Sequence, residues 1–337
     1  NNTVISGNYG IKVESSSNNV IYHNNFINNT QNAYDDSTNQ WYNATLREGN
    51  YWSDFDEPSE GAYDNNSDGI ADSPYTVPGA AGTQDLYPLM HPYGSITNLD
   101  TGEVFLTIQD AIDDSDTLAG HTIFVKNGTY YENVVVNKRI NLIGQDRNET
   151  IIDGGGSGDV VYVSADHVNI GNITVTNSGD RYEEAYRDAG IDLVSDHNTL
   201  FNINASNNNR FGVSIYYASY NTISNCLVSN NYGVGIPFIG GVYNNITHCV
   251  ISNNSIHGEG GIDLSVTSYN RISHCLITKN HGIGGVYIDS GHEVADNNII
   301  EYNTIRDNFA LAGIYIGMSP NIEHNNKVHH NNFINNT

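Results

Sequence analysis

The sequence predicts an all-β fold, a right-handed parallel β-helix (solenoid) with a short helical N-terminal cap and an irregular linker module. Two observations predict this class. Helix-favouring residues are scarce, because the 337-residue chain contains 51 Asn, 33 Gly and 23 Tyr. Short alternating segments bounded by Gly and Asn also return at regular intervals through the second half of the chain, which is typical of a solenoid.

The repeat is clearest in a six-residue motif such as Asn221–Cys226. Its last position falls at residues 203, 226, 249, 275, 303 and 331, and a Gly-apolar-x-apolar strand precedes it in each turn. The stretch between one of these positions and the next is long enough for three short strands. A propeller blade needs about 40 residues, and the signature of a leucine-rich repeat is missing. Equivalent residues of successive coils are therefore expected to stack in ladders about 4.8 Å apart.

The chain is expected to divide into three parts, because coil-like sequence stands at both ends and irregular sequence lies between. The expected parts are terminal β-helix coils at 1–30, a linker module at 31–94 with a calcium-like loop, and a capped parallel β-helix at 95–337.

A helical cap is predicted at 103–120. Ile108, Ala111 and Ile112 have the spacing of one helix face. An open solenoid end exposes apolar core and strand edges, so it needs a cover. Strands are expected after the cap, at Thr122–Val125, Val134–Val136 and Ile140–Ile143.

The segment TIQDAID…HTIFVKNGTYYENVVVNKRINLIG, followed by Asn-rich coils, resembles the pectin-lyase-type β-helix. More narrowly, it is similar to the NosD-like proteins with carbohydrate-binding and sugar hydrolysis repeats. The stretch GNYWSDF…DNNSDGIADSPY…DLYPLM looks like the tail of such proteins on methanogen cell surfaces, including disaggregatase-related ones. The resemblance implies the fold and a cell-surface setting. It leaves the activity open, because this fold hosts lyases, hydrolases, binders and structural proteins.

The two ends of the chain carry the same sequence. Residues 330–337 and residues 23–30 both read HNNFINNT, an offset of 307 residues. One interpretation is a slice of a tandem array, or protomers whose ends continue one another's helices. Such head-to-tail contacts do not close and build filaments. The alternative is chance similarity between coils of a repetitive sequence.

The charge disfavours several partners. Lys and Arg number 13 against 38 Asp and Glu, and the formal net charge of −25 argues against nucleic acid and anionic membranes. No apolar run is long enough to span a bilayer, and no organic cofactor is expected.

The acidic segment 64–72 has the spacing of a Ca²⁺ loop, with oxygen ligands at positions 1, 3, 5 and 9, Gly at 6 and a backbone carbonyl at 7. Tyr75 stands where an EF-hand has its bidentate Glu, so the segment is closer to the shorter loops of extracellular calcium repeats. The alternative is a cluster of Asx turns. The expected ligands are Asp64, Asn66, Asp68, Ile70 and Asp72.

Cysteines and histidines share ladder positions in the predicted coils. Cys226, Cys249 and Cys275 are expected to be buried free thiols, although a disulfide between neighbouring coils is sterically allowed. His248 and His274 are expected to stack as a solvated ladder. A copper or zinc site there would need further ligands, and the sequence shows none.

Tyr220, Tyr243 and Tyr269 are in phase. They form either a carbohydrate-binding platform or an aromatic ladder that stiffens the wall.

Glycosidase chemistry needs two carboxylates about 5–10 Å apart. Asp192 and Asp263 are in phase but three coils apart, about 14 Å. The charged insertion at 181–188 is the best candidate for a functional loop, its alternative being a solvated surface loop. No residue is assigned as catalytic, and the candidates for lining a cleft are Glu183, Glu184, Arg187, Asp188, Asp192 and Arg210.

Several Asn-x-Ser/Thr sequons fall in predicted turns, where a glycan would fit. The glycosylation candidates are Asn43, Asn127, Asn148, Asn245 and Asn253.

The sequence favours an extracellular, non-enzymatic role. The leading hypothesis is a structural repeat module of a surface filament, sheath or array, whose partners are copies of itself bound head-to-tail. The alternative is a cell-surface β-helix protein that binds or degrades polysaccharide as a lyase or hydrolase.

Overall fold

The computed structural model describes residues 2–65, 69–90, 92–183, 186–255, 260–289, 295–317 and 325–337. The chain divides into two compact units. The first comprises Asn1–Thr97 with Gly102–Leu106, and the second comprises Asn98–Thr101 with Thr107–Thr337.

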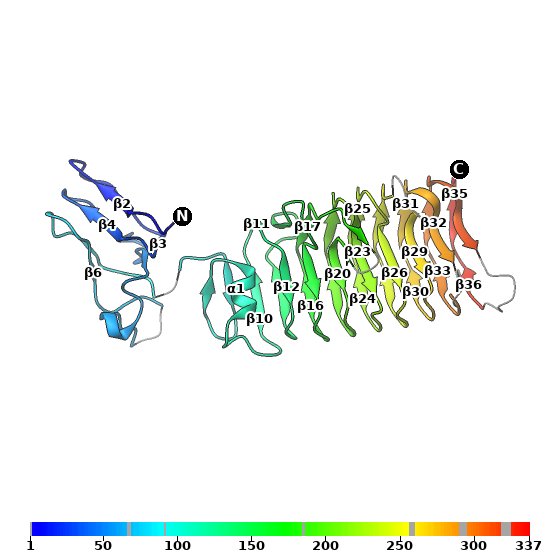
Figure 1. The fold of residues 1–337 in the computed structure, drawn as a ribbon, viewed down its shortest axis with the longest axis horizontal. Helices are drawn as coiled ribbons and strands as arrows, with labels where there is room; N and C mark the ends of the chain where they lie inside the picture. The colour runs from blue at the N-terminus through cyan, green and yellow to red at the C-terminus, as the bar shows by residue number, and fades with distance from the viewer. Residues whose placement is uncertain are drawn as a thin grey trace. The chain divides into compact units, whose positions relative to one another are not determined.

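The second unit is a parallel β-helix, in which successive coils add one strand to each of three sheets (Figure 1). The first sheet contains, in spatial order, β10 (Thr122–Val125), β13 (Asn141–Gly144), β16 (Asn169–Gly171), β21 (Thr199–Phe201), β24 (Thr222–Ser224), β27 (Asn245–Thr247), β30 (Arg271–Ser273), β33 (Ile299–Glu301) and β36 (Lys327–His329). The second contains β11 (Gly128–Tyr131), β14 (Thr150–Asp153), β17 (Thr174–Thr176), β22 (Asn204–Ser206), β25 (Leu227–Ser229), β28 (Val250–Ser252), β31 (Leu276–Thr278), β34 (Thr304–Arg306) and β37 (Asn332–Ile334). The third contains β12 (Val134–Val136), β15 (Val161–Val163), β20 (Ala189–Leu193), β23 (Phe211–Tyr216), β26 (Ile236–Ile239), β29 (Gly260–Ser265), β32 (His281–Asp289) and β35 (Phe309–Gly317).

The strand register confirms the predicted repeat. Ile223 pairs with Ile246, which pairs with Ile272, and all three are buried. Because side chains alternate across a strand, each coil turns every second residue inward and the stacked coils share one apolar core.

The predicted cap region, 103–120, contains one short helix. Helix α1 spans Ile108–Asp113, and it packs against β10 and β12. Thr107 caps its first turn by accepting from the N–H of Asp110, and Asp114 leaves the helical conformation. The predicted apolar face is confirmed, since Ile108, Ala111 and Ile112 are buried. No helix in the described parts of the chain has the length and apolar character needed to cross a membrane.

Buried asparagines line the turns between the sheets. In the second unit, from Asn198 onwards, these asparagines follow residues with left-handed backbone, as Asn231 follows Asn230 (φ 56°). The backbone N–H and Nδ2 of Asn208 both donate to Oδ1 of Asn231 at 3.0 Å, and Nδ2 of Asn231 donates to the Ala205 carbonyl at 3.0 Å. Each amide thus satisfies backbone groups of a neighbouring coil that the sheets leave unpaired.

Three cysteines replace asparagine in one of these ladders. Cys226, Cys249 and Cys275 are buried free thiols, as expected. The N–H of Cys226 donates to Sγ of Cys249 at 3.4 Å, and the N–H of Cys275 donates to Oδ1 of Asn303 at 2.8 Å. Sulfur therefore takes the acceptor place that an amide oxygen takes in later coils.

The first unit is built from shorter strands around one aromatic core. Phe26, Trp41, Trp52 and Tyr75 are buried in this core, and the rings of Trp52 and Tyr75 stack at 4.2 Å. Its elements are the parallel strands β1 (Asn2–Ile5), β3 (Asn24–Ile27) and β5 (Tyr51–Trp52), the parallel pair β2 (Tyr9–Val13) and β4 (Gln31–Asp35), the antiparallel pair β6 (Tyr75–Thr76) and β7 (Gln84–Asp85), and the 3-10 turn η1 (Pro58–Glu60). Strands β8 (Ile96–Asn98) and β9 (Val104–Phe105) form an antiparallel pair.

Two buried aspartates organise this first unit. Nε1 of Trp41 donates to Asp35 at 2.9 Å, and Nε1 of Trp52 donates to Asp85 at 3.1 Å. The N–H of Asn50 also donates to Asp85, at 2.7 Å. Burial favours the neutral acid, but hydrogen bonds from Trp41, Ser37, Asn39 and Thr83 keep the pKa of Asp35 below its ordinary value. At Asp85 burial prevails and raises the pKa to about 6.

Candidate functional site

The main cluster of buried charge in the second unit lies where β15 pairs with β20. Asp188 and Asp192 are 1% and 8% exposed. Asp159 joins them because its Oδ1 accepts from the N–H of Ala189 at 2.8 Å. Arg181 places its Nε and Nη2 3.1 Å and 3.0 Å from Oδ1 of Asp188. The structure therefore brings three carboxylates and one guanidinium together.

The carboxyl group of Asp159 has a raised pKa. Burial and the carboxylates of Asp192 and Asp188 raise its pKa to about 7. Burial and the same acidic surroundings raise the pKa of Tyr162. A hollow of about 390 Å³ beside them is lined in part by Val135. This arrangement can hold or release a proton near neutral pH.

Sequence reasoning missed Asp159. Val161 pairs with Ile191, so Asp159 stands level with Ala189 and beside Asp188. The charged insertion lengthens this coil to 30 residues and hides the correspondence from a count based on 23-residue steps. Counting back from the Gly190-Ile191 strand would have found it.

The predicted cleft residues are only partly brought together. Asp188 and Asp192 share the cluster. Arg210 stands level with Asp188 on the next coil, because Ala189 pairs with Phe211, and its guanidinium lies over the ring of Phe211 at 5.1 Å. Glu183 and Arg187 belong to the antiparallel hairpin of β18 (Tyr182–Glu183) and β19 (Tyr186–Arg187), and Glu184 lies outside the described residues.

The in-phase spacing of two acids is as expected. Asp192 pairs with Ser214, and Pro237 pairs with Asp263, with one further coil step between. Three steps of about 4.8 Å exceed the carboxylate separations of glycosidases.

The tyrosines form a stack with His167 and His197. Ring centroids are 4.9 Å apart between His197 and Tyr220, 5.2 Å between Tyr220 and Tyr243, and 5.0 Å between Tyr243 and Tyr269. The rings are about half exposed, and each covers the face of the next. A sugar can reach the edges and hydroxyls along the stack, but a full ring face only at its ends. Carbohydrate binding by these residues stays a prediction.

His248 and His274 belong to a second stack. Their centroids are 5.0 Å apart, and the stack continues through Tyr302 to His330. Oε2 of Glu301 lies 3.5 Å from Nε2 of His329, beside this stack. In the part of the chain that the structure describes, no three His, Cys, Asp or Glu side chains form a group able to hold a metal ion. A solvated aromatic ladder describes this geometry.

The predicted calcium loop is described only at its ends, because Asn66 and Asp68 lie outside the described residues. Oδ2 of Asp64 accepts from the N–H of Gly69 at 2.8 Å. Oδ2 of Asp72 accepts from the N–H and Nδ2 of Asn65, which lowers the pKa of Asp72. Ile70 forms a bridge with Leu89. Calcium binding stays a prediction.

The predicted glycosylation sites differ in exposure. Asn127, Asn148 and Asn253 are exposed, whereas Asn43 and Asn245 are partly buried. Oδ1 of Asn43 accepts from the N–H of Thr45 at 2.9 Å. Glycosylation at all five sites stays a prediction.

Two family models match the sequence. The model described as "Right handed beta helix region" matches residues 140–299 and 189–337, which is more than half of the chain. The model described as "Periplasmic copper-binding protein (NosD)" matches residues 1–57.

The residues of the NosD-like segment do not fit a copper site. Copper favours imidazole and sulfur ligands, yet residues 1–57 hold one histidine, His23, and neither Cys nor Met. Nε2 of His23 lies 2.5 Å from Oε2 of Glu48, and its ring stacks on Tyr93 at 3.8 Å. This histidine is already engaged within the first unit.

A cell surface glycoprotein of Methanothermus fervidus is 47% identical over 47 residues. The match covers 14% of this chain and only 8% of the glycoprotein.

Solved β-helical structures align at low identity. The pectin methylesterase of Aspergillus niger is 18% identical, with 68% of this chain and 83% of that chain covered and a TM-score of 0.46. The periplasmic alginate epimerase AlgG is 15% identical, with 62% of this chain and 46% of that chain covered and a TM-score of 0.42. Alignments at this level say nothing of activity. Because the family model covers most of the parallel β-helix, this chain belongs to the right-handed β-helix family and carries a NosD-like segment at residues 1–57.

Proposed function

We propose that this chain is a structural repeat module on the outside of the cell, whose copies associate head-to-tail. The repeated octapeptide carries the proposal. Phe26 lies in β3 and is 2% exposed, because Trp52 of the following coil stacks on it at 4.8 Å. Phe333 holds the same place in β37 and is 52% exposed. The same coil sequence is thus covered by a further coil in the first unit, and under the proposal the next copy supplies the equivalent cover in the second.

Two apolar edges of the chain suit such an association. Val328, Phe333 and Ile334 are 37%, 52% and 46% exposed on the last strands of their sheets. Ile5 is 56% exposed on β1, and a hollow of about 720 Å³ beside it is lined in part by Ile11. Parallel pairing of β37 of one copy with β1 of another would continue the ladder and bury both edges.

The matches support the location. The cell surface glycoprotein of Methanothermus fervidus and the model named for a periplasmic protein both describe proteins outside the cytoplasm. The acidic composition suits a solvated outer surface.

Electron microscopy and analytical ultracentrifugation of the purified chain test the proposal. We expect filaments or linear oligomers that lengthen with protein concentration, because a heterologous contact does not close. Monodisperse monomers at every concentration would overturn it.

A further inference from the structure

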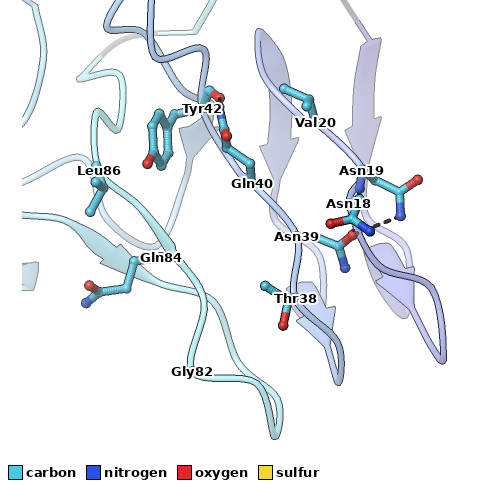
Figure 2. A pocket seen from close by; sticks show the side chains of 10 residues that line it. All are labelled: Asn18, Asn19, Val20, Thr38, Asn39, Gln40, Tyr42, Gly82, Gln84 and Leu86. Atoms are coloured by element: carbon cyan, nitrogen blue, oxygen red, sulfur yellow. Dashed lines mark hydrogen bonds between the residues drawn. The ribbon is translucent and has the colours of Figure 1, made fainter.

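The first unit contains a separate hollow of about 530 Å³, shown in Figure 2. Residues 18–20 and 38–42 lie on neighbouring coils, joined by the N–H of Gln40 donating to the carbonyl of Asn19 at 2.9 Å. Residues 82–86 form the opposite wall. The volume falls within the roughly 300–1,000 Å³ of small-molecule sites.

The lining of this hollow carries amides but no charged side chain. Five of its 10 residues are Asn or Gln, and none is Asp, Glu, Lys, Arg or His. Oδ1 of Asn39 accepts from the N–H and Nδ2 of Asn19, and Nδ2 of Asn39 donates to Ser16 and Asp35. Gln40 and Gln84 are therefore the amides that can donate to and accept from sugar hydroxyls. A wall without charges offers no partner to an ion, and a chain of net charge −25 repels anionic sugars.

Two of the amides are held in place. Nε2 of Gln40 donates to the carbonyl of Tyr42 at 2.8 Å. Nε2 of Gln84 donates to Oγ1 of Thr76 at 3.2 Å. Each bond uses one donor of an amide that has two donors and an acceptor oxygen, so capacity remains for a ligand. Fixed amides lose little entropy on binding.

Apolar side chains complete the lining. Val20 and Leu86 are 57% and 43% exposed, and Tyr42 stands between the two walls. Such side chains can cover the apolar faces of a sugar ring. We infer that this hollow binds an uncharged saccharide through its amides and apolar side chains. The inference specifies the polysaccharide-binding alternative and does not rest on head-to-tail assembly.

The test titrates the full chain with methyl glycosides of glucose, galactose and mannose, with N-acetylglucosamine, and with galacturonate as a charged counterpart. Saturation-transfer NMR and calorimetry follow binding. We expect millimolar or tighter binding of at least one neutral probe and none of galacturonate. Gln40→Ala and Gln84→Ala should each weaken binding about three- to tenfold.

Tyr63→Ala is the matched control, because Tyr63 is half exposed in the same unit and outside the hollow. It should leave the affinity unchanged. Near-UV circular dichroism checks each fold, and the exposed Gln84 decides the outcome if Gln40→Ala does not fold. Failure of every neutral probe to bind, preference for galacturonate, or unchanged affinity in the folded glutamine variants would overturn the inference.

Discussion

Oδ1 of Asn254 accepts both the backbone N–H and Nδ2 of Asn231, at 3.2 Å and 2.9 Å. Nδ2 of Asn254 in turn donates to the carbonyl of Val228 at 3.0 Å, and its N–H donates to Oδ1 of Asn280 at 3.1 Å. One residue thus joins three coils inside a turn. Asparagines therefore have a structural role in the turns of the solenoid.

Asn254→Ala should destabilise the second unit by about 3 kcal/mol, because it leaves the buried N–H of Asn231 and the carbonyl of Val228 without partners. Urea unfolding measures the change. Asn148→Ala is the control, since Asn148 is exposed and should cost less than about 0.5 kcal/mol. Equal effects of the two variants would contradict the structural role of the ladder.

Phe333→Asp should weaken head-to-tail association about 100-fold or more, because it places a charge in an apolar contact. Sedimentation velocity across a concentration series reads out the change. Leu118→Asp introduces the same charge at a site that is 60% exposed and outside the last coil, and it should leave association intact. If both variants assemble like the parent chain, the contact does not use β37.

The stability of the second unit should depend on the protonation of Asp159. The pKa of Asp159 is about 7 in the folded chain against an ordinary value of 3.8, so the folded state binds this proton more tightly. The resulting stabilisation is fully present below about pH 4 and is lost as the pH rises through about 7. Its size is on the order of 2–4 kcal/mol.

Urea unfolding between about pH 4 and pH 8 measures this dependence. Asp159→Asn should flatten the curve for the second unit. The stability of the first unit should still depend on pH in this variant, since burial raises the pKa of Asp85 to about 6. Asp116→Asn changes an exposed acid and should follow the parent curve. Parallel curves for the parent chain and Asp159→Asn would argue against the raised pKa.

We propose that Ca²⁺ binds the loop between Asp64 and Asp72. Addition of millimolar Ca²⁺ should raise the melting temperature of the first unit, and a chelator should reverse the rise. At a concentration 100 times its Kd, the ion would add about 2.7 kcal/mol. Asp64→Ala should abolish the effect, whereas Asp113→Ala, at an exposed acid of helix α1, should not. A melting temperature that ignores Ca²⁺ would contradict the site.

The sequence predicted ladder positions well. Cys226 and Cys249, Tyr220 and Tyr243, and Ile223 and Ile246 all meet on successive coils as their spacing required. Each ladder obeys a local rule, because a coil of known length returns every residue to the same place one strand spacing further on. The apolar spacing of Ile108, Ala111 and Ile112 predicted the buried face of helix α1, but it did not predict where the helix ends.

By itself, the sequence determined the class of fold, the order of its coils and the residues that stack, because all of these follow from periodicity. Only the tertiary structure placed Asp159 beside Asp188 and brought residues 18–20 and 38–42 opposite residues 82–86. Those meetings depend on the lengths and bends of irregular segments, and no repeat encodes them. The same holds for the hydrogen bond from the Trp52 indole to Asp85. These two residues lie 33 positions apart in a region without a periodic pattern.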